Sequence, residues 1–249
     1  MIIGISGKIN SGKDTVGKII QILTQSPHFT NKGVLNFLDR DLQNPKFTIE
    51  KFGGKLKDVV CILIGCTREQ LEDEVFKNTE LGEEWWYYKG DTKLFSYNTL
   101  HKTNKKLPLV KLTPRLMLQL IGTECMRNII HPNTWVNALM SEYKESPIKV
   151  KIVNENCVPY KKFPNWIITD VRFSNELEAV KTKNGISIRV NRITDNVLIN
   201  NDTHAVTDYQ HESEVALDNA KFDYVINNNG SLESLINSVR FILTKEKLL

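Results

Sequence analysis

Residues 1–15 read MIIGISGKINSGKDT (Met1–Thr15), an apolar run that leads through a glycine-rich turn into the start of a helix. The spacing Gly7-x4-Gly12-Lys13 between a strand and a helix is typical of a phosphate-binding loop. The glycines let consecutive backbone N–H groups turn inward, and the N-terminus of the helix adds further donors. A glycine- and lysine-rich turn without a ligand is the alternative. We expect the phosphates of a nucleotide to be held by Gly7, Asn10, Ser11, Gly12, Lys13, Asp14 and Thr15.

Asp14 follows the lysine at the position where such loops usually carry Ser or Thr. The usual hydroxyl binds Mg²⁺, and a carboxylate also suits this hard cation, directly or through water. Thr15, the next residue, is then the candidate hydroxyl donor to a phosphate. The alternative for Asp14 is an acid that complements the helix dipole in the first turn. We expect Asp14 to be linked to the metal.

The rest of the chain alternates predicted strands and helices, which indicates an α/β protein with a doubly wound, mostly parallel sheet. Strands are expected near residues 1–6, 48–52, 166–169, 186–190 and 222–226, and helices near 13–24, 34–41, 55–64, 67–76, 175–183 and 231–244. The 249 residues suit a single domain that spans the chain. An irregular insert at 77–112 begins acidic, becomes aromatic and ends basic, so it is either a lid or an aromatic hairpin.

The composition is that of a globular protein. Hydrophobic residues make up 41% and charged residues 25% of the chain, which excludes a disordered or fibrous protein. No apolar run approaches the roughly 18–20 residues that cross a bilayer, and no basic leader precedes the first strand, so we expect a cytoplasmic location. The four cysteines lack the spacing of a zinc site. The net charge of +4 is too small to indicate nucleic-acid binding by itself.

Asp170 is a second candidate because it follows the apolar run Trp166–Thr169, which reads as a buried parallel strand. Open α/β sheets bind ligands beyond the carboxyl ends of their strands. Asp170 could therefore hold a metal-bound water, and Arg172 could point into the same crevice. In the alternative, Asp170 caps the next helix and Arg172 pairs with Glu176.

Arg115 and Arg127 are candidates for binding phosphate oxygens, because phosphoryl transfer needs cations on the group that moves. Thr113 and Pro114 predict the start of a helix, as its cap and first residue. Twelve residues of straight helix span about 18 Å, so the two arginines serve different phosphates unless the helix breaks near Gly122. Surface arginines without a ligand are the alternative.

Together these motifs resemble phage-type deoxynucleoside monophosphate kinases, which belong to the P-loop nucleoside monophosphate kinase superfamily. The resemblance runs with gaps from Ile2 to about Leu235. The motifs that carry it are Gly7-x4-Gly12-Lys13-Asp14-Thr15, Thr113-Pro114-Arg115-x3-Gln119-x2-Gly122-Thr123-Glu124, Trp135, Asp170-Val171-Arg172-Phe173-x-Asn175-Glu176 and His211-x-Ser213-Glu214. The segment from Trp85 to Lys111 matches no block of the family.

The resemblance implies a core with acceptor-binding and lid insertions, and transfer of the γ-phosphoryl group of ATP to a deoxynucleoside 5′-monophosphate with Mg²⁺. It implies catalytic roles for Lys13, Arg115, Arg127, Asp170 and Arg172, and metal binding by Asp14 and Asp170. It implies contacts with the donor nucleotide from Asn228, Asn229 and Gly230. It implies that the acceptor is bound by Phe52, Lys55, Lys57, Arg115, Trp135, Arg172, His211 and Glu214. An amphipathic helix at 55–57, a plain turn at 228–230 and a capping box at 211–214 are the competing interpretations.

The resemblance also implies small-molecule substrates, no stable nucleic-acid partner, no membrane association and, for a virus-encoded enzyme, the host cytoplasm; a homodimer is left open. Three other functions remain open. A different P-loop kinase would act on dephospho-coenzyme A or phosphomevalonate. A nucleic-acid-stimulated NTPase would stack bases on the aromatic insert. A kinase-like scaffold would bind nucleotide without turnover.

Overall fold

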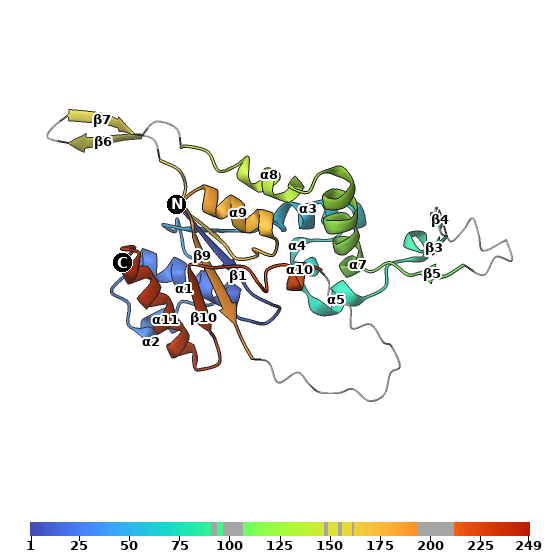
Figure 1. Cartoon of the computed structure of the whole chain (residues 1–249), viewed down its shortest axis with the longest axis horizontal. Helices are drawn as coiled ribbons and strands as arrows, with labels where there is room; N and C mark the ends of the chain where they lie inside the picture. Colours follow the sequence, from blue (N-terminus) through green and yellow to red (C-terminus); the bar gives the residue numbers. More distant parts are fainter. Residues whose placement is uncertain (91–93, 97–106, 147–148, 154–155, 161, 194–211) are drawn as a thin grey trace. The chain divides into compact units, whose positions relative to one another are not determined.

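The structure is a computed structural model that describes residues 1–90, 94–96, 107–146, 149–153, 156–160, 162–193 and 212–249 (Figure 1). Within these residues a five-stranded sheet forms the centre of the fold, with the strand order β10-β9-β1-β8-β2. Its neighbouring strands are all parallel, which confirms the predicted α/β class. The strands are β1 (Ile2–Ser6), β2 (Thr48–Glu50), β8 (Trp166–Ile168), β9 (Ile186–Asn191) and β10 (Tyr224–Asn227).

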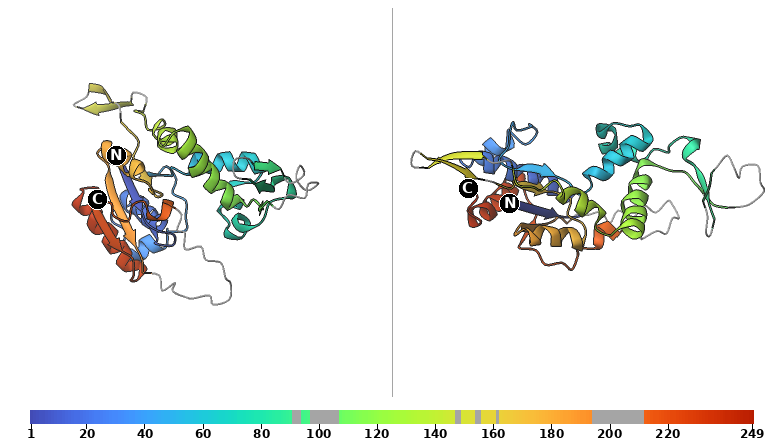
Figure 2. Two further views of the ribbon diagram at one scale, coloured as in Figure 1. Left: turned by 45° about the vertical axis from the view of Figure 1, so that its right-hand side comes forward. Right: turned by 90° about the horizontal axis from the view of Figure 1, so that it is seen from above.

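Helices cover both faces of this sheet (Figure 2). On β1, a Cβ at Gly4 would meet Val180 of α9 (Ser174–Thr182), whereas Ile5 packs toward Gly17 of α1 (Lys13–Gln25). Strands β1 and β8 are buried along their whole length, as expected for parallel strands covered on both faces. The main core joins these strands to α1 and to α11 (Leu232–Lys245).

The parallel pairing brings the carboxyl ends of the strands to one edge of the sheet. Ile3 of β1 is in register with Ile167 of β8 and Ile186 of β9. The glycine-rich loop after β1, Lys51 after β2, Asp170 after β8 and Asn228 after β10 therefore all leave the sheet at this edge. This is the edge at which such sheets bind ligands.

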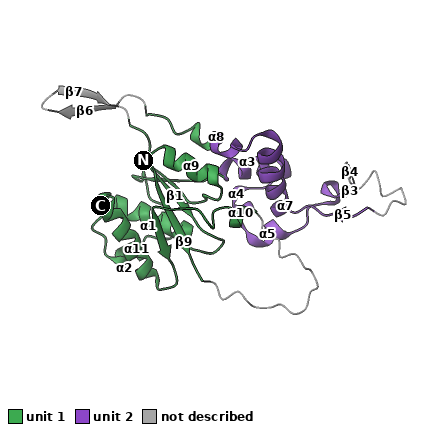
Figure 3. Cartoon of the chain, in the orientation of Figure 1, with its two compact units in different colours: residues 1–52, 139–249 green, residues 53–138 purple. Residues whose placement is uncertain are grey.

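The chain divides into two compact units, residues 1–52 with 139–249 and residues 53–138 (Figure 3). Unit 1 holds the parallel sheet, α2 (Asn31–Leu35) and α10 (Glu212–Val215), together with a two-stranded hairpin of β6 (Lys149–Val153) and β7 (Asn156–Tyr160). The strands expected from the sequence do not include this hairpin. The helix expected at 34–41 is wrong, since α2 ends at Leu35.

Unit 2 is mainly helical and has its own core around Val60, Leu71, Leu112 and Met117. Its described insert residues form an antiparallel sheet in the order β4-β3-β5. The lid and hairpin interpretations of the insert both stay open. The elements are α3 (Gly54–Ile64), α4 (Arg68–Glu72), α5 (Glu74–Asn78), η1 (Glu83–Trp85), β3 (Tyr87–Lys89), β4 (Leu94–Ser96), β5 (Leu109–Val110), α7 (Pro114–Gln119) and η2 (Leu120–Ile130), followed by α8 (Thr134–Met140), which crosses the unit boundary.

Two predicted helices of unit 2 change character along their length. The helix expected at 67–76 is divided at Asp73, whose extended backbone ends α4 and whose carboxylate caps α5. The helix that begins with Thr113 as cap and Pro114 as first residue, as predicted, continues from Leu120 as the π-helix η2. Among the described residues, no helix combines the length and apolar character needed to cross a membrane.

Candidate functional site

The glycine-rich loop ends at Gly12, which has a positive φ of 92° and directly precedes α1. No side chain caps α1, so the first backbone N–H groups of this helix have no side-chain acceptor. Ser11 lies beside them, only 2% exposed, and its hydroxyl has no hydrogen-bond partner within the described part of the chain. Buried hydroxyl groups are normally hydrogen-bonded. An acceptor such as a phosphate oxygen would supply the missing partner.

Gly7 shows that the loop is built for close approach of backbone to backbone. A Cβ on Gly7 would lie 2.3 Å from the Ser11 hydroxyl and 2.7 Å from the Val190 carbonyl oxygen. A glycine is therefore required at this turn. The Ser11 backbone is fixed from the other side, where the Asn228 amide donates to the Ser11 carbonyl oxygen at 2.9 Å.

Lys13 places a buried cation in the same loop. Its side chain is 8% exposed, and its ammonium donates to the Lys8 carbonyl oxygen at 3.3 Å. Burial and the nearby charge of Arg172 lower the pKa of Lys13, although Asp14 and Glu214 act in the opposite direction. A buried cation next to a second cation favours an anionic ligand, because the ligand would compensate both charges.

Asp14 is held by two groups from neighbouring strands. The Thr169 hydroxyl donates to its carboxylate at 2.9 Å, and the Lys51 ammonium lies 2.9 Å from the same oxygen. Partial desolvation alone would raise the pKa of Asp14, but the bond and charge of Lys51 outweigh this effect and lower the pKa overall. The carboxylate therefore stays ionised at neutral pH, while its side chain remains 59% exposed.

Asp170 lies at the same edge of the sheet and accepts a hydrogen bond from the Phe52 N–H at 2.8 Å. The described residues contain no cluster of three or more His, Cys, Asp or Glu side chains that could bind a metal unaided. Mg²⁺ does not need one, since it usually takes one or two carboxylates and completes its shell with phosphates and water. Asp14 and Asp170 are ionisable oxygen donors of the kind that Mg²⁺ prefers, so the chemistry of the donor set fits this ion.

Arg172 pairs with Glu214 rather than with Glu176, the partner weighed in the sequence analysis. Glu176 instead accepts the backbone N–H groups of Arg172 and Phe173 at 2.7 and 3.1 Å. Glu214 also accepts the Ile9 N–H of the glycine-rich loop at 3.1 Å. A carboxylate of α10 thus takes up one donor of the loop and the nearby guanidinium.

The same segment is attached to the loop a second time through Asp218. The Asp218 carboxylate lies 3.2 Å from the Lys8 ammonium and 2.8 Å from the Arg189 guanidinium. Two acids within five residues therefore contact cations and a backbone N–H group around the loop. In the nucleotide-free structure these two carboxylates therefore neutralise cations at the loop and occupy one of its backbone donors.

The turn after β10 lies beside the glycine-rich loop. Asn228 contacts Ser11 as described above, and the Asn229 side chain accepts the Ile193 N–H at 2.7 Å. Gly230 is exposed. The structure thus brings this turn, Lys13, Asp14 and Arg172 to one edge of unit 1.

The remaining predicted residues lie elsewhere in the structure. In unit 2, Arg115 pairs with Glu74 and donates to the Asn78 side chain at 2.8 Å. Lys57 pairs with Glu72, Lys55 is exposed on α3, and Arg127 lies on η2. Phe52, in unit 1, is 1% exposed, so its ring belongs to the interior. His211 lies outside the described residues.

Trp135 is a buried residue of unit 2 rather than an exposed one. It is 4% exposed, and its indole N–H donates to the Gly122 carbonyl oxygen of η2 at 2.8 Å. Its described contact therefore joins α8 to η2. The expected contact of Trp135 with the acceptor stays a prediction.

Lys51 and Thr169 are the site residues that sequence reasoning missed. Both follow strands whose carboxyl ends meet the loop after β1, and both contact Asp14. The signal was present in the strand assignments, because parallel neighbours of β1 must deliver their next residues to the same edge. Finding Lys51 and Thr169 from the sequence also required the order of the strands, which the sequence does not give.

Comparison with known proteins gives three matches. The family model described as deoxynucleotide monophosphate kinase matches residues 55–239. The chain is 26% identical over 227 residues to the deoxynucleoside-5′-monophosphate kinase of Escherichia phage T5, covering 80% of this chain and 77% of the relative. It is 28% identical over 135 residues to a predicted deoxynucleotide monophosphate kinase of Acanthamoeba polyphaga mimivirus, covering 51% of this chain and 59% of that protein.

Proposed function

The chain belongs to the deoxynucleotide monophosphate kinase family and is a phosphotransferase of nucleotide metabolism, and from this premise we propose its donor, its metal and the roles of its residues. The donor is ATP, bound by the loop of Gly7, Asn10, Ser11, Gly12, Lys13, Asp14 and Thr15. The acceptor is a deoxynucleoside 5′-monophosphate, which leaves as the diphosphate. The observation that carries this proposal is the buried Ser11 hydroxyl, which has no hydrogen-bond partner among the described residues and lies beside the uncapped N-terminus of α1.

The reaction requires one bond to form and one to break. An oxygen of the acceptor phosphate attacks the γ-phosphorus of ATP, and the bond from that phosphorus to the bridging oxygen of ADP breaks. The acceptor phosphate is already ionised near neutral pH, so no catalytic base is needed. Catalysis then depends on position and on charge stabilisation.

Lys13 and Arg172 supply positive charge at the loop in this mechanism. Lys13 lies within the loop, and its lowered pKa reflects both burial and the nearness of Arg172. Two cations whose repulsion is relieved by an incoming anion stabilise added negative charge in the transition state. Arg172 can take this role only after it leaves Glu214, and the donor must also displace Glu214 from the Ile9 N–H.

Asp14 and Asp170 would hold Mg²⁺, which when bound neutralises charge on the phosphate oxygens. Lys51 and Thr169 orient Asp14 through the two contacts at 2.9 Å. The Phe52 N–H orients Asp170. Because Lys51 keeps Asp14 ionised, the site is ready for a cation at neutral pH.

The turn after β10 would contact the base of the donor through Asn228, Asn229 and Gly230. The support is the bond from Asn228 to the Ser11 carbonyl oxygen, which places the turn beside the phosphate loop. Basic side chains of unit 2 would bind the acceptor phosphate, and they are Lys55, Lys57, Arg115 and Arg127. Glu214 and His211 remain candidates for contact with the acceptor.

An acceptor panel tests the proposal. The full chain is incubated with ATP and Mg²⁺ and, separately, each deoxynucleoside monophosphate, each ribonucleoside monophosphate, dephospho-coenzyme A and phosphomevalonate, with mass detection of products. We expect deoxynucleoside diphosphates. A product from either of the last two acceptors alone, or hydrolysis that only rises when DNA is added, would point to one of the competing functions.

Lys13→Ala tests the placement of the donor in the loop. We expect turnover to fall at least a hundredfold, because one fixed charge donor to a developing phosphoryl charge is worth about 2.7–4 kcal/mol. Lys18→Ala on the same helix is the matched control, since Lys18 points away from the loop to an ion pair with Asp41. Near-normal turnover in Lys13→Ala would contradict the assignment.

A further inference from the structure

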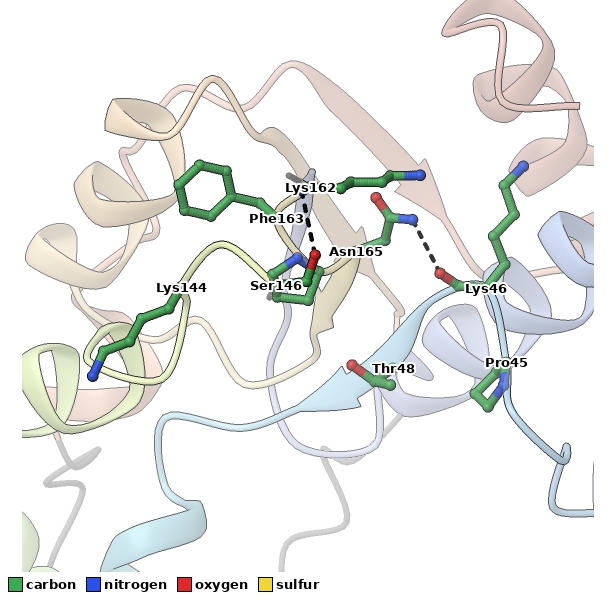
Figure 4. Close-up of a pocket in the computed structure, with 9 residues that line it drawn as sticks. Pro45, Lys46, Thr48, Lys144, Ser146, Lys162, Phe163 and Asn165 are labelled. Atoms are coloured by element: carbon green, nitrogen blue, oxygen red, sulfur yellow. Dashed lines mark hydrogen bonds between the residues drawn. The ribbon is translucent and has the colours of Figure 1, made fainter. Parts of the chain in front are cut away.

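Unit 1 contains a pocket that the mechanism does not use (Figure 4). It is an open pocket of about 400 Å³, a volume within the range of small-molecule sites. Thr48 begins β2 and Asn165 directly precedes β8, so the pocket lies at the amino ends of these strands. The phosphate loop and Asp170 follow the carboxyl ends of β1 and β8. The two sites therefore lie at opposite edges of the sheet.

The wall of this pocket is positively charged. Lys46, Lys144 and Lys162 line it, and none of the nine residues on the wall is Asp or Glu. Within the described part of the chain none of these three ammonium groups forms an ion pair with a carboxylate. In Figure 4 the Lys162 side chain extends toward the side of the view on which Lys46 lies, whereas Lys144 points away from both. Lys46 and Lys162 are therefore the pair best placed to share one anion.

Hydrogen bonds hold the backbone of both lysines. The Lys46 N–H donates to the Gln25 side chain at 2.9 Å, and its carbonyl oxygen accepts the Asn165 side-chain amide at 3.1 Å. The Lys162 carbonyl oxygen accepts the Ser146 N–H at 2.9 Å. The backbone from which the two side chains extend is thus held in place before any ligand arrives.

Phe163 adds an aromatic surface to the same wall. Its side chain is 41% exposed and stacks on Tyr143, with ring centroids 5.1 Å apart and planes tilted by 19°. Tyr143 in turn packs edge-on against Trp166 at 4.8 Å, which fixes the stack to the first residue of β8. A rigid, half-exposed ring beside cations suits a ligand that has both a planar base and phosphates.

We propose that this pocket binds the phosphate chain of a free nucleotide, with Lys46 and Lys162 on the phosphates and Phe163 beside the base. Inorganic polyphosphate carries the same negative charges but has no base. Contact with Phe163 would therefore strengthen the binding of a nucleotide and not that of polyphosphate. The strands that border the pocket continue to Lys51 and Thr169, the two residues that hold Asp14. A nucleotide bound here is therefore positioned to modulate the catalytic loop.

Calorimetric titration of the full chain with tripolyphosphate and with a deoxynucleoside triphosphate tests the proposal. The double variant K46A/K162A removes the paired cations. K183A/K221A is the matched control, because it removes the same charge from exposed lysines near the amino ends of β9 and β10, at the other side of the sheet. Lys13→Ala separates this binding event from binding at the phosphate loop.

We expect one binding event to survive in Lys13→Ala and to weaken about tenfold or more in K46A/K162A, as for loss of two charged donors. The control should retain it, and kcat/KM for phosphoryl transfer without added effector should stay unchanged in both double variants. Weaker nucleotide binding but unchanged tripolyphosphate binding in Phe163→Leu would support the nucleotide as ligand. Equal effects of Phe163→Leu on both probes, or unchanged binding in K46A/K162A, would overturn the proposal.

Discussion

Glu214→Gln most directly tests whether the Glu214 carboxylate occupies the glycine-rich loop before nucleotide binds. The Glu214 carboxylate accepts the Ile9 N–H at 3.1 Å and pairs with Arg172, and its side chain is 18% exposed. In the proposed mechanism, ATP in the loop displaces both contacts. An amide keeps the shape of the side chain but loses its charge, so the contacts that compete with ATP become weaker.

The size of the effect follows from these two contacts. A hydrogen bond to a charged group contributes about 1.5–3 kcal/mol, against about 0.5–1.5 kcal/mol for a neutral one. Losing the charge on two contacts should therefore cost the nucleotide-free state about 1–2 kcal/mol, after allowance for the partial exposure of Arg172. We expect Glu214→Gln to bind ATP about 5–30-fold more tightly than the unmodified chain.

Titration with a fluorescent ATP analogue, without acceptor, measures this change. Glu212→Gln is the matched control, because Glu212 is an exposed acid on the same helix. The control should leave the affinity within about twofold, since a single exposed charge contributes little. Unchanged or weaker ATP binding in Glu214→Gln would refute the view that this carboxylate competes with phosphate for the loop.

Three further substitutions probe charge and backbone. Lys13→Met should raise the Tm of the nucleotide-free chain and abolish turnover. The folded state lowers the pKa of Lys13, so the charge of this lysine destabilises the fold at every pH below that pKa. An unchanged or lower Tm would contradict this prediction. Gly12→Ala should lower the unfolding free energy by about 1–2 kcal/mol and weaken ATP binding. A φ of 92° is strained for alanine, and the added Cβ would lie 2.5 Å from a neighbouring asparagine amide. Gly54→Ala is the control, because Gly54 has open space around it, and it should change neither quantity in the same thermal melts and titrations. The Tyr224 hydroxyl donates to Glu246, and this hydrogen bond raises the pKa of Tyr224 to about 12. The resulting stabilisation is present below pH 10 and is lost as the pH rises from 10 to about 12. Tyr224→Phe should therefore lower the Tm at pH 8 but not at pH 12.

The glycine-rich loop between β1 and α1 was predictable from the sequence because its determinants are local. Gly7, Gly12 and Lys13 act through backbone conformation and spacing within seven residues. The strands near it were predictable for a similar reason, since runs such as Ile2–Ser6 and Trp166–Ile168 are apolar throughout, as strands buried on both faces must be.

The partners of the site residues were not predictable, because they lie far away in the sequence. Glu176 was a candidate partner of Arg172 because it lies four residues further along the chain. In the structure Arg172 pairs with Glu214, which is 42 residues away. Asp14 meets Thr169 across 155 residues. Such pairs depend on strand order, which the pattern of apolar residues does not determine.

Residue type was a weaker guide in unit 2. The resemblance implied that Arg115 and Trp135 bind the acceptor, which stays a prediction; in the structure Trp135 is buried against Gly122 and Arg115 pairs with Glu74. The missing information was the change to a π-helix at Leu120, which places the Gly122 carbonyl oxygen within reach of the indole. No short-range pattern in this stretch announces that change.

The π-helix η2 also determines which length changes the protein can absorb. In a helix wound with i→i+5 bonds each residue turns the chain less than in an α-helix, so eleven residues from Leu120 to Ile130 carry more backbone than an α-helix of equal rotation needs. A shorter chain here would let the ordinary i→i+4 bonding return, whereas shortening α1 would rotate its apolar residues away from the core. Natural insertions and deletions should therefore be tolerated best in η2. Each of them would change the direction in which Arg127 points.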